Sequence, residues 1–246
     1  MKILFSGALS ALALIALAGP ARSAVTYDAA LSPPGTYFGT GNTNDHWVVE
    51  TATQVELGLG VKIRFLNTVT PTSTNVYDVA PGDTTVPGKS GSLWGFTFSA
   101  RALTGLLSGL TLSMSITDYA HGTTVTFDPN LLPDNAGTDG TLTVGGGNGC
   151  FGDTSAACVA GTRTGLQNAE ALSFVSGVAN GFDPHYESGA NNTWEITLSA
   201  SVGNVPVASV TEFVNAGIGS PLPEPASLAV LGIGLLGLGF GRRRCG

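Results

Sequence analysis

The chain has few charged residues, and its central part has almost no basic ones. Asp, Glu, Lys and Arg make up 11% of the 246 residues, and half of the ten bases lie near the two ends. Residues 24–220 therefore carry 16 acids against 5 bases, a formal charge of −11. Nucleic acid binding needs Lys and Arg to neutralise phosphates. This charge balance argues against a nucleic acid partner and suits an exported domain.

The signatures of common enzyme families are also missing. The sequence has no HExxH zinc motif and no GxSxG nucleophile elbow. The glycine-rich run at 145–149 is followed by neither a helical pattern nor a lysine, which a phosphate-binding loop requires. His46, His121 and His185 lie in polar segments rich in Gly or Pro, where solvated loop positions are expected. We therefore expect a protein that is not an enzyme and that needs no cofactor.

Cysteine is scarce, with three residues in the chain. Cys150 and Cys158 lie in a glycine-rich segment, and their spacing is too wide for a CxxC zinc knuckle. In an oxidising compartment these two cysteines are expected to form a local disulfide, the alternative being two free thiols. Cys245 lies apart from them, near the end of the chain.

The first 23 residues have the pattern of a secretory signal peptide. Lys2 is followed by the apolar stretch Ile3–Ala18 and by the helix breakers Gly19-Pro20. Ala21-Arg22-Ser23 then offers small residues at the positions that signal peptidase recognises. We expect cleavage before Ala24, the alternative being an uncleaved membrane anchor.

The central region has the alternating pattern of β-strands. In Val55–Leu66, apolar residues from Val55 to Phe65 alternate with Glu, Gly, Lys and Arg, as in a half-buried antiparallel strand. Further strands are expected at Trp94–Phe98, Leu112–Ile116, Thr123–Phe127, Thr141–Val144, Ala171–Val175, Trp194–Ala200 and Val205–Phe213. Gly and Pro turns separate these segments. The pattern predicts that residues 24–220 form an all-β domain, an antiparallel β-sandwich or jelly roll of about eight or nine strands.

One turn offers oxygen ligands that could hold calcium. Asp134, Asn135 and Asp139 lie close together in the sequence, and Ca²⁺ prefers carboxylate and amide oxygens from loops. Their order does not match an EF-hand, and Asp and Asn are also ordinary turn residues. We therefore expect no metal, and keep these three as the calcium candidates.

A glycan-binding surface needs exposed aromatic rings beside polar groups. Trp94 and Trp194 fall in alternating strands, where core packing is expected. Trp47, next to Asp45 and His46, is the candidate for a glycan contact.

The end of the chain has three successive parts: the extended segment Pro223-Glu224-Pro225, the apolar run Ala226–Gly241, and the basic cluster Arg242, Arg243 and Arg244. Proline keeps the first part extended and accessible. The apolar run is expected to form a transmembrane helix, with the arginines on its cytoplasmic side. At 16 residues it is shorter than the roughly 20 that a stable span prefers, and it contains several glycines. A transient single-pass anchor fits this run better than a permanent one.

This order of parts resembles the PEP-CTERM sorting signal of Gram-negative bacteria, over residues 221–246. The resemblance implies that an exosortase cuts at the motif and that the protein then reaches the cell surface or the extracellular matrix, commonly in bacteria that make exopolysaccharide. Glu224 and its flanking prolines would be substrate features. A sortase LPxTG motif is less similar, since Pro225 and Ala226 stand where it has Thr and Gly.

The central region also resembles unnamed domains of PEP-CTERM proteins that have no assigned activity. The shared pieces are Asp45-His46-Trp47, Trp94-Gly95-Phe96, Thr117-Asp118-Tyr119, Phe127-Asp128-Pro129 and Gly181-Phe182-Asp183-Pro184.

Together, the sequence predicts an exported surface or matrix protein. Signal peptidase and an exosortase would process it, the inner membrane would hold it transiently, and exopolysaccharide is a candidate partner. We expect a structural or adhesive role, with a secreted glycan-binding module as the alternative and a hydrolase third.

Overall fold

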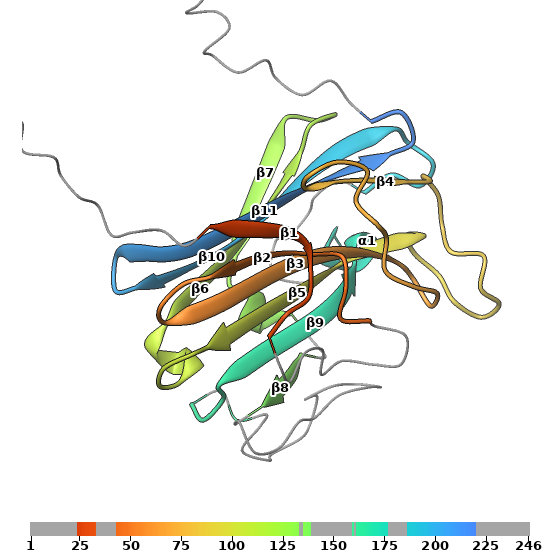
Figure 1. Ribbon diagram of the computed structural model, residues 1–246. Coiled ribbons are helices and arrows are strands. Elements are labelled where there is room, and N and C mark those ends of the chain that lie inside the picture. The colour runs from red at the N-terminus through yellow and green to blue at the C-terminus, as the bar shows by residue number, and fades with distance from the viewer. Residues whose placement is uncertain are drawn as a thin grey trace, which may run out of the picture.

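The computed structural model describes residues 24–32, 43–132, 135–138, 159, 161–176 and 186–219 (Figure 1). The predicted signal peptide, the tail at 221–246, Cys150, Cys158 and the predicted strand at 141–144 lie outside these residues. Within the described ranges, no helix is long and apolar enough to cross a membrane.

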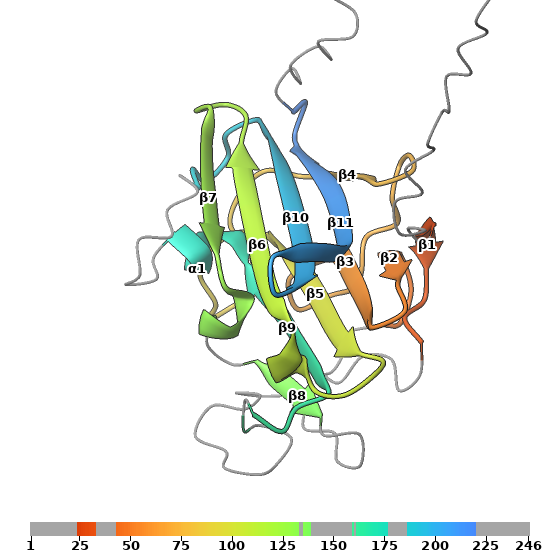
Figure 2. The ribbon, with the colours of Figure 1, turned by 90° about the vertical axis from the view of Figure 1, so that its left-hand side faces the viewer.

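Two β-sheets stack face to face (Figures 1 and 2). The first has the order β1-β2-β3-β5-β9-β8, with strands β1 Val25–Ala29, β2 Trp47–Thr51, β3 Val55–Ile63, β5 Trp94–Ala102, β9 Gly165–Ala171 and β8 Ala136–Thr138. The second has the order β4-β11-β10-β6-β7, with strands β4 Val76–Val79, β11 Val205–Ala216, β10 Asn192–Val202, β6 Thr111–Asp118 and β7 Thr123–Phe127. The predicted all-β sandwich is confirmed. The described part of the chain has eleven strands rather than eight or nine, and β4 pairs with β11 in parallel.

Three short helical segments complete the described structure: η1 Leu107–Gly109, η2 Pro129–Leu131 and α1 Leu172–Ser176. The last replaces a predicted strand. Alternation over Ala171–Val175 would bury Leu172 together with Phe174, but the structure buries Leu172 and Val175 and leaves 46% of Phe174 exposed. A spacing of three between buried residues is the period of a helical turn, so that prediction was wrong.

The core lies between the inner faces of the two sheets. β5 contributes Trp94, Phe96 and Phe98, which are fully buried in one cluster with Met114 and Ile116 of β6. β10 and β11 form a long hairpin, whose turn has Gly203 at a φ of 58°. The left-handed region favours glycine there.

β3 is buried on both faces over Val55–Val61, not on one face as predicted. On its outer face, Gly58 and Gly60 lie under Trp47 and Leu31. A Cβ atom at Gly58 would lie 2.5 Å from Leu31 Cδ2 and 3.2 Å from Trp47 Cε3. The glycines thus make room for a second, smaller hydrophobic cluster outside the sheet.

The strands also define one end of the sandwich, which we call the C-terminal pole. β11 ends there at Ala216, β6 ends at Asp118, and β5 begins at Trp94. The register places Asp118 opposite Trp194 of β10. The chain leaves the described sandwich near this pole, at Gly219.

Candidate functional site

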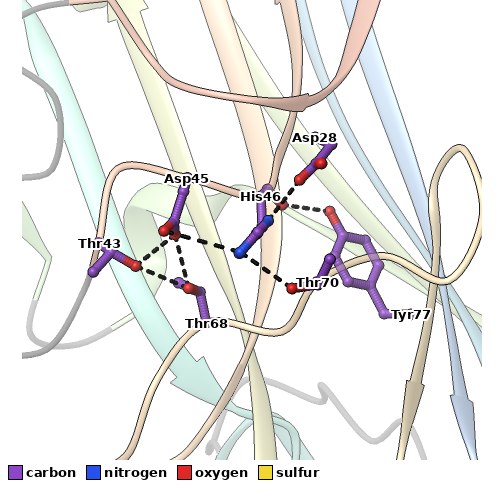
Figure 3. Close-up of polar contacts among 7 residues, drawn as sticks. All are labelled: Asp28, Thr43, Asp45, His46, Thr68, Thr70 and Tyr77. Atoms are coloured by element: carbon purple, nitrogen blue, oxygen red, sulfur yellow. Dashed lines mark hydrogen bonds and ion pairs between the residues drawn. The ribbon is translucent and has the colours of Figure 1, made fainter.

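His46 is the centre of a polar network at the start of β2 (Figure 3). Its Nδ1 contacts Oδ1 of Asp28, which lies in β1 where the pairing with β2 shifts register. Both residues have positive φ, 61° for His46 and 50° for Asp28. Such backbone outliers persist only where surrounding contacts hold them. The Asp28–His46 pair is therefore a specific feature of this edge of the fold.

The other ring nitrogen of His46 faces the segment that follows β3. Its Nε2 lies 3.2 Å from Thr70 Oγ1 and 3.9 Å from Asp45 Oδ2. The backbone carbonyl of His46 accepts a 2.7 Å hydrogen bond from the hydroxyl of Tyr77 in β4. His46 thus joins β1, the segment after β3, and β4.

Asp45 supports this network from the adjacent position. Its Oδ1 accepts hydrogen bonds from the hydroxyl groups of Thr43 and Thr68. Partial burial raises the pKa of Asp45, but these hydrogen bonds and the charge of His46 outweigh burial and bring that pKa below its ordinary value of 3.8.

Thr70, His46 and Asp28 have the order hydroxyl, imidazole and carboxylate, which is also the order of a catalytic triad. Catalysis further needs a cavity that places substrate against the hydroxyl. The cavity at the C-terminal pole and a second cavity beside η1 are lined by other residues. We interpret the His46 network as a cross-link between segments.

A second Asp–His pair lies at the C-terminal pole, in the turn after β6. Asp118 is fully buried, and its Oδ1 accepts from the backbone N–H of His121 at 3.0 Å and from Asn192 Nδ2 at 2.8 Å. Its Oδ2 lies 2.7 Å from His121 Nδ1. This hydrogen bond and the charge of Asp118 raise the pKa of His121 above its ordinary value of 6.5.

This pair borders a cavity of about 180 Å³. Trp94 and Trp194 line it from β5 and β10, and His121, Tyr186 and Glu187 line it from the turns. The Nε1 of Trp94 is buried and has no hydrogen-bond partner in the part of the chain that the structure describes. Tyr186 donates to the carbonyl of Gly82 at 2.6 Å, and burial, followed by the charge of Asp83, raises the pKa of Tyr186 to about 12.

The predicted glycan candidate is not at the surface. Trp47 is 2% exposed, Trp94 0% and Trp194 3%. Core packing is thereby confirmed for Trp94 and Trp194. The burial of Trp47 counts against the glycan contact proposed for it, since a sugar needs an accessible ring face.

Of the three calcium candidates, Asp134 and Asp139 lie outside the described residues. Asn135 is buried, and its amide nitrogen donates to the carbonyls of Pro129 and Leu132. Its side-chain oxygen accepts from Asn168 Nδ2 at 3.0 Å. Asn135 thus has a structural role, and the described residues contain no group of three or more His, Cys, Asp or Glu that could hold a metal.

Sequence reasoning missed that both described histidines are paired with aspartates. The spacing of Asp118 and His121, followed by Gly122 at a φ of 63°, is a local signal for a turn that could have revealed one pair. Asp28 and His46 are 18 residues apart, and no local pattern connects them.

One comparison with known proteins gives a match. Residues 221–244 match the PEP-CTERM protein-sorting motif. No curated protein and no solved structure matches the chain. The matched segment follows β11, which ends at Ala216. The motif implies processing by an exosortase, export, and sorting to the cell surface. The chain is therefore an exported protein that contains a PEP-CTERM protein-sorting motif.

Proposed function

We propose that the mature protein is a structural or adhesive component of the cell envelope or extracellular matrix, and that it is not an enzyme. One observation carries the proposal: a β-sandwich whose last strand ends at Ala216 is followed almost directly by the sorting motif at 221–244. An exosortase substrate built in this way delivers a single folded domain to the outside of the cell.

The proposed route follows from the chemistry of the two ends. Signal peptidase removes residues 1–23, and the helix 226–241 then holds the chain transiently in the inner membrane. Arg242 to Arg244 remain on the cytoplasmic side. The exosortase cuts at Pro223-Glu224-Pro225, and the domain reaches the surface with a Cys150–Cys158 disulfide.

The contacts of His46 and His121, the two histidines that the structure describes, support a role without catalysis. His46 joins three segments through its side chain and its carbonyl, and His121 holds the turn after β6 to the buried Asp118. Both histidines therefore connect segments of the sandwich, a structural role that suits a domain whose task is to remain folded outside the cell.

Mass spectrometry of the protein recovered from the cell surface tests this route. We expect mature chains that start at Ala24 and lack 226–246, and a larger, membrane-bound form in cells without exosortase. Glu224→Ala should slow the conversion, while Glu187→Ala in the sandwich should not. Surface protein that retains its tail would refute processing, and protein recovered only in the culture medium, away from cells and matrix, would refute the adhesive role.

A further inference from the structure

Three exposed apolar side chains form a patch at the C-terminal pole. Phe65 and Leu66, in the turn after β3, are 48% and 64% exposed, and Phe174 of α1 is 46% exposed. β3 ends at this pole because its last residue, Ile63, pairs with Trp94 at the start of β5. α1 follows β9, which pairs with the same end of β5. We call Phe65, Leu66 and Phe174 the apolar patch.

Basic side chains are held against the rings of this patch. The guanidinium carbon of Arg64 lies 4.9 Å from the ring centre of Phe65 and 4.7 Å from that of Phe174. Lys89 Nζ lies 5.3 Å from the ring centre of Phe65. Phe65 itself has a φ of 65°, an outlier for a bulky residue, and such conformations persist where the surroundings or a function require them. These contacts combine apolar and positively charged groups in one surface.

Most of the bases of the domain lie at this pole. Residues 24–220 contain five bases, and three of them lie around the patch, Lys62, Arg64 and Lys89. The other two lie towards the opposite end, in the later part of β5 and just before β9. Two exposed acids at the pole, Asp83 and Glu187, belong to the turns around the cavity. A domain with a charge of −11 thus places most of its positive charge around one apolar patch, which suits a negatively charged partner with an apolar interior.

The patch also lies near the point where the chain leaves the sandwich. The backbone N–H of Gly217 donates to the carbonyl of Val79, three residues before Gly82. The carbonyl of Gly82 accepts from the N–H of Leu93, whose own carbonyl accepts from the N–H of Arg64. A short series of backbone hydrogen bonds therefore joins the end of β11 to the patch.

The tail keeps this pole close to the membrane while 226–241 spans it. Six residues, 220–225, separate Gly219 from the apolar run that begins at Ala226. A chain of that length reaches at most about 25 Å. β11, with 12 residues, spans roughly 40 Å. The C-terminal pole is therefore the end of the sandwich that the tail holds beside the bilayer, and Ile218, 90% exposed, lies there as well.

We propose that the apolar patch docks on the bilayer while the tail still anchors the chain, with its three side chains in the headgroup interface and Arg64 and Lys89 at anionic phosphates. The inference rests on the transient anchor of the proposed function and deepens it. So small a patch binds a bilayer weakly by itself, but the anchor supplies a high local concentration. Cutting the tail removes this advantage, so the docked state ends when the exosortase releases the domain.

Tryptophan reporters in the full-length chain test the docking. The chain is reconstituted into phosphatidylcholine vesicles with about 30% phosphatidylglycerol, whose acyl chains are either ordinary or dibrominated. Bromine quenches a tryptophan that enters the bilayer. Phe65→Trp places a reporter in the patch, Leu131→Trp places one at a residue that is 54% exposed towards the opposite end, and the wild type gives the background of its three buried tryptophans. We expect bromine to remove at least about half of the fluorescence added by Phe65→Trp and less than about a tenth of that added by Leu131→Trp.

Matched variants in the Phe65→Trp chain identify the contributing groups. Leu66→Ser should reduce the quenching at least about twofold, whereas Val205→Ser, at a residue 61% exposed in the hairpin at the opposite end, should leave it unchanged. Lys89→Gln should reduce the quenching in vesicles with phosphatidylglycerol and have no effect without it. If Phe65→Trp does not fold, as judged by circular dichroism, Phe174→Trp replaces it as the reporter.

Equal quenching of the two reporters, or equal effects of Leu66→Ser and Val205→Ser, would overturn the docking. Two other results would do so by assigning the patch to another occupant. A blue shift of the Phe65→Trp emission without quenching, growing with the number of chains per vesicle, would indicate a second copy of the chain. A blue shift that requires an added polyuronate would indicate an acidic polysaccharide.

Flotation of the vesicles separates this inference from the proposed function. A chain that does not float with the vesicles would refute the anchor and the docking together. A chain that floats without quenching would refute the docking alone and leave the sorting route intact.

Discussion

Glu212 is a buried acid in the middle of the apolar face of β11. It lies between Val210 and Val214 on the side that faces the core, and it is 0% exposed. In the described part of the chain, neither of its carboxyl oxygens has a hydrogen-bond partner. Burial without compensation disfavours the charged form and raises the pKa of Glu212 well above its ordinary value of 4.5.

This residue should make the protein less stable as the pH rises. Above pH 4.5 the unfolded chain releases the proton of Glu212 while the folded chain retains it, so the free energy of unfolding falls until the folded-state pKa is reached. Glu212→Gln should remove this part of the pH dependence, and Glu212→Leu should stabilise the fold by about 1–3 kcal/mol at neutral pH. Urea unfolding at pH 5 and pH 8 measures both effects.

The control for Glu212 is Glu195→Gln in β10, a carboxyl that accepts a hydrogen bond from Tyr119 and is not in the apolar core. The comparison shows whether the slope depends on the buried carboxyl of Glu212 or on removing any acid from the sandwich. An unchanged slope in Glu212→Gln would contradict the explanation.

The Asp118–His121 pair gives a second prediction for single residues. Because Asp118 raises the pKa of His121, Asp118→Asn should bring that pKa back towards 6.5, as followed by NMR titration of the imidazole C–H signals. The signal of His46, which Asp28 contacts, is the internal control and should not move. The stabilisation from the pair is complete below pH 6.5 and is lost as the pH rises through the folded-state pKa of His121. A His121 titration unchanged by Asp118→Asn would show that another group sets it.

At the scale of strands, Gly95 of β5 allows the close approach of β9. A Cβ atom at this position would collide with the backbone carbonyl of Glu170, which cannot move without disturbing the pairing of the two strands. Gly95→Ala should therefore destabilise the fold by about 3 kcal/mol. Gly109 has open space around it, and Gly109→Ala should change stability by less than about 0.5 kcal/mol. Thermal unfolding of the two variants separates them, and similar midpoints would contradict this account.

Period-two alternation predicted the strands that bury one face clearly, such as β6, β7 and β10. β2 was missed because both of its faces are covered over Trp47–Glu50, so that it shows no alternation. β4 was missed because it has only four residues and depends on parallel pairing with the end of β11, 137 residues away in the case of Asp78 and Asn215. Local sequence contains no signal for contacts of this kind.

The cavity at the C-terminal pole could not be predicted for the same reason. Trp94, His121 and Glu187 come from distant parts of the chain, and only the sheet topology brings them together. Trp94 and Trp194 were correctly expected in the core, but alternation does not predict that the indole N–H of Trp94 has no partner among the described residues. Glu212, by contrast, shares its alternating face with Val210 and Val214, a signal visible in the sequence.

At the scale of the whole molecule, the domain combines a stable sandwich with a large excess of negative charge. Residues 24–220 carry 16 acids and 5 bases. The excess negative charges repel one another, and this repulsion opposes the compact state. Salt screens such charges, with a Debye length of about 10 Å at 0.1 M. We therefore expect the midpoint of thermal unfolding to rise between low and physiological ionic strength.

Comparing salts separates screening from a specific calcium site. If screening alone acts, NaCl, MgCl₂ and CaCl₂ at equal ionic strength should raise the midpoint by similar amounts, and Asp139→Asn should respond to CaCl₂ as the wild type does. This is the expected result, because Asn135 already uses its side chain for hydrogen bonds to Asn168 and to backbone carbonyls. A larger rise with CaCl₂ alone, lost in Asp139→Asn, would instead establish calcium binding that involves Asp139 and would refute the expectation of a metal-free domain.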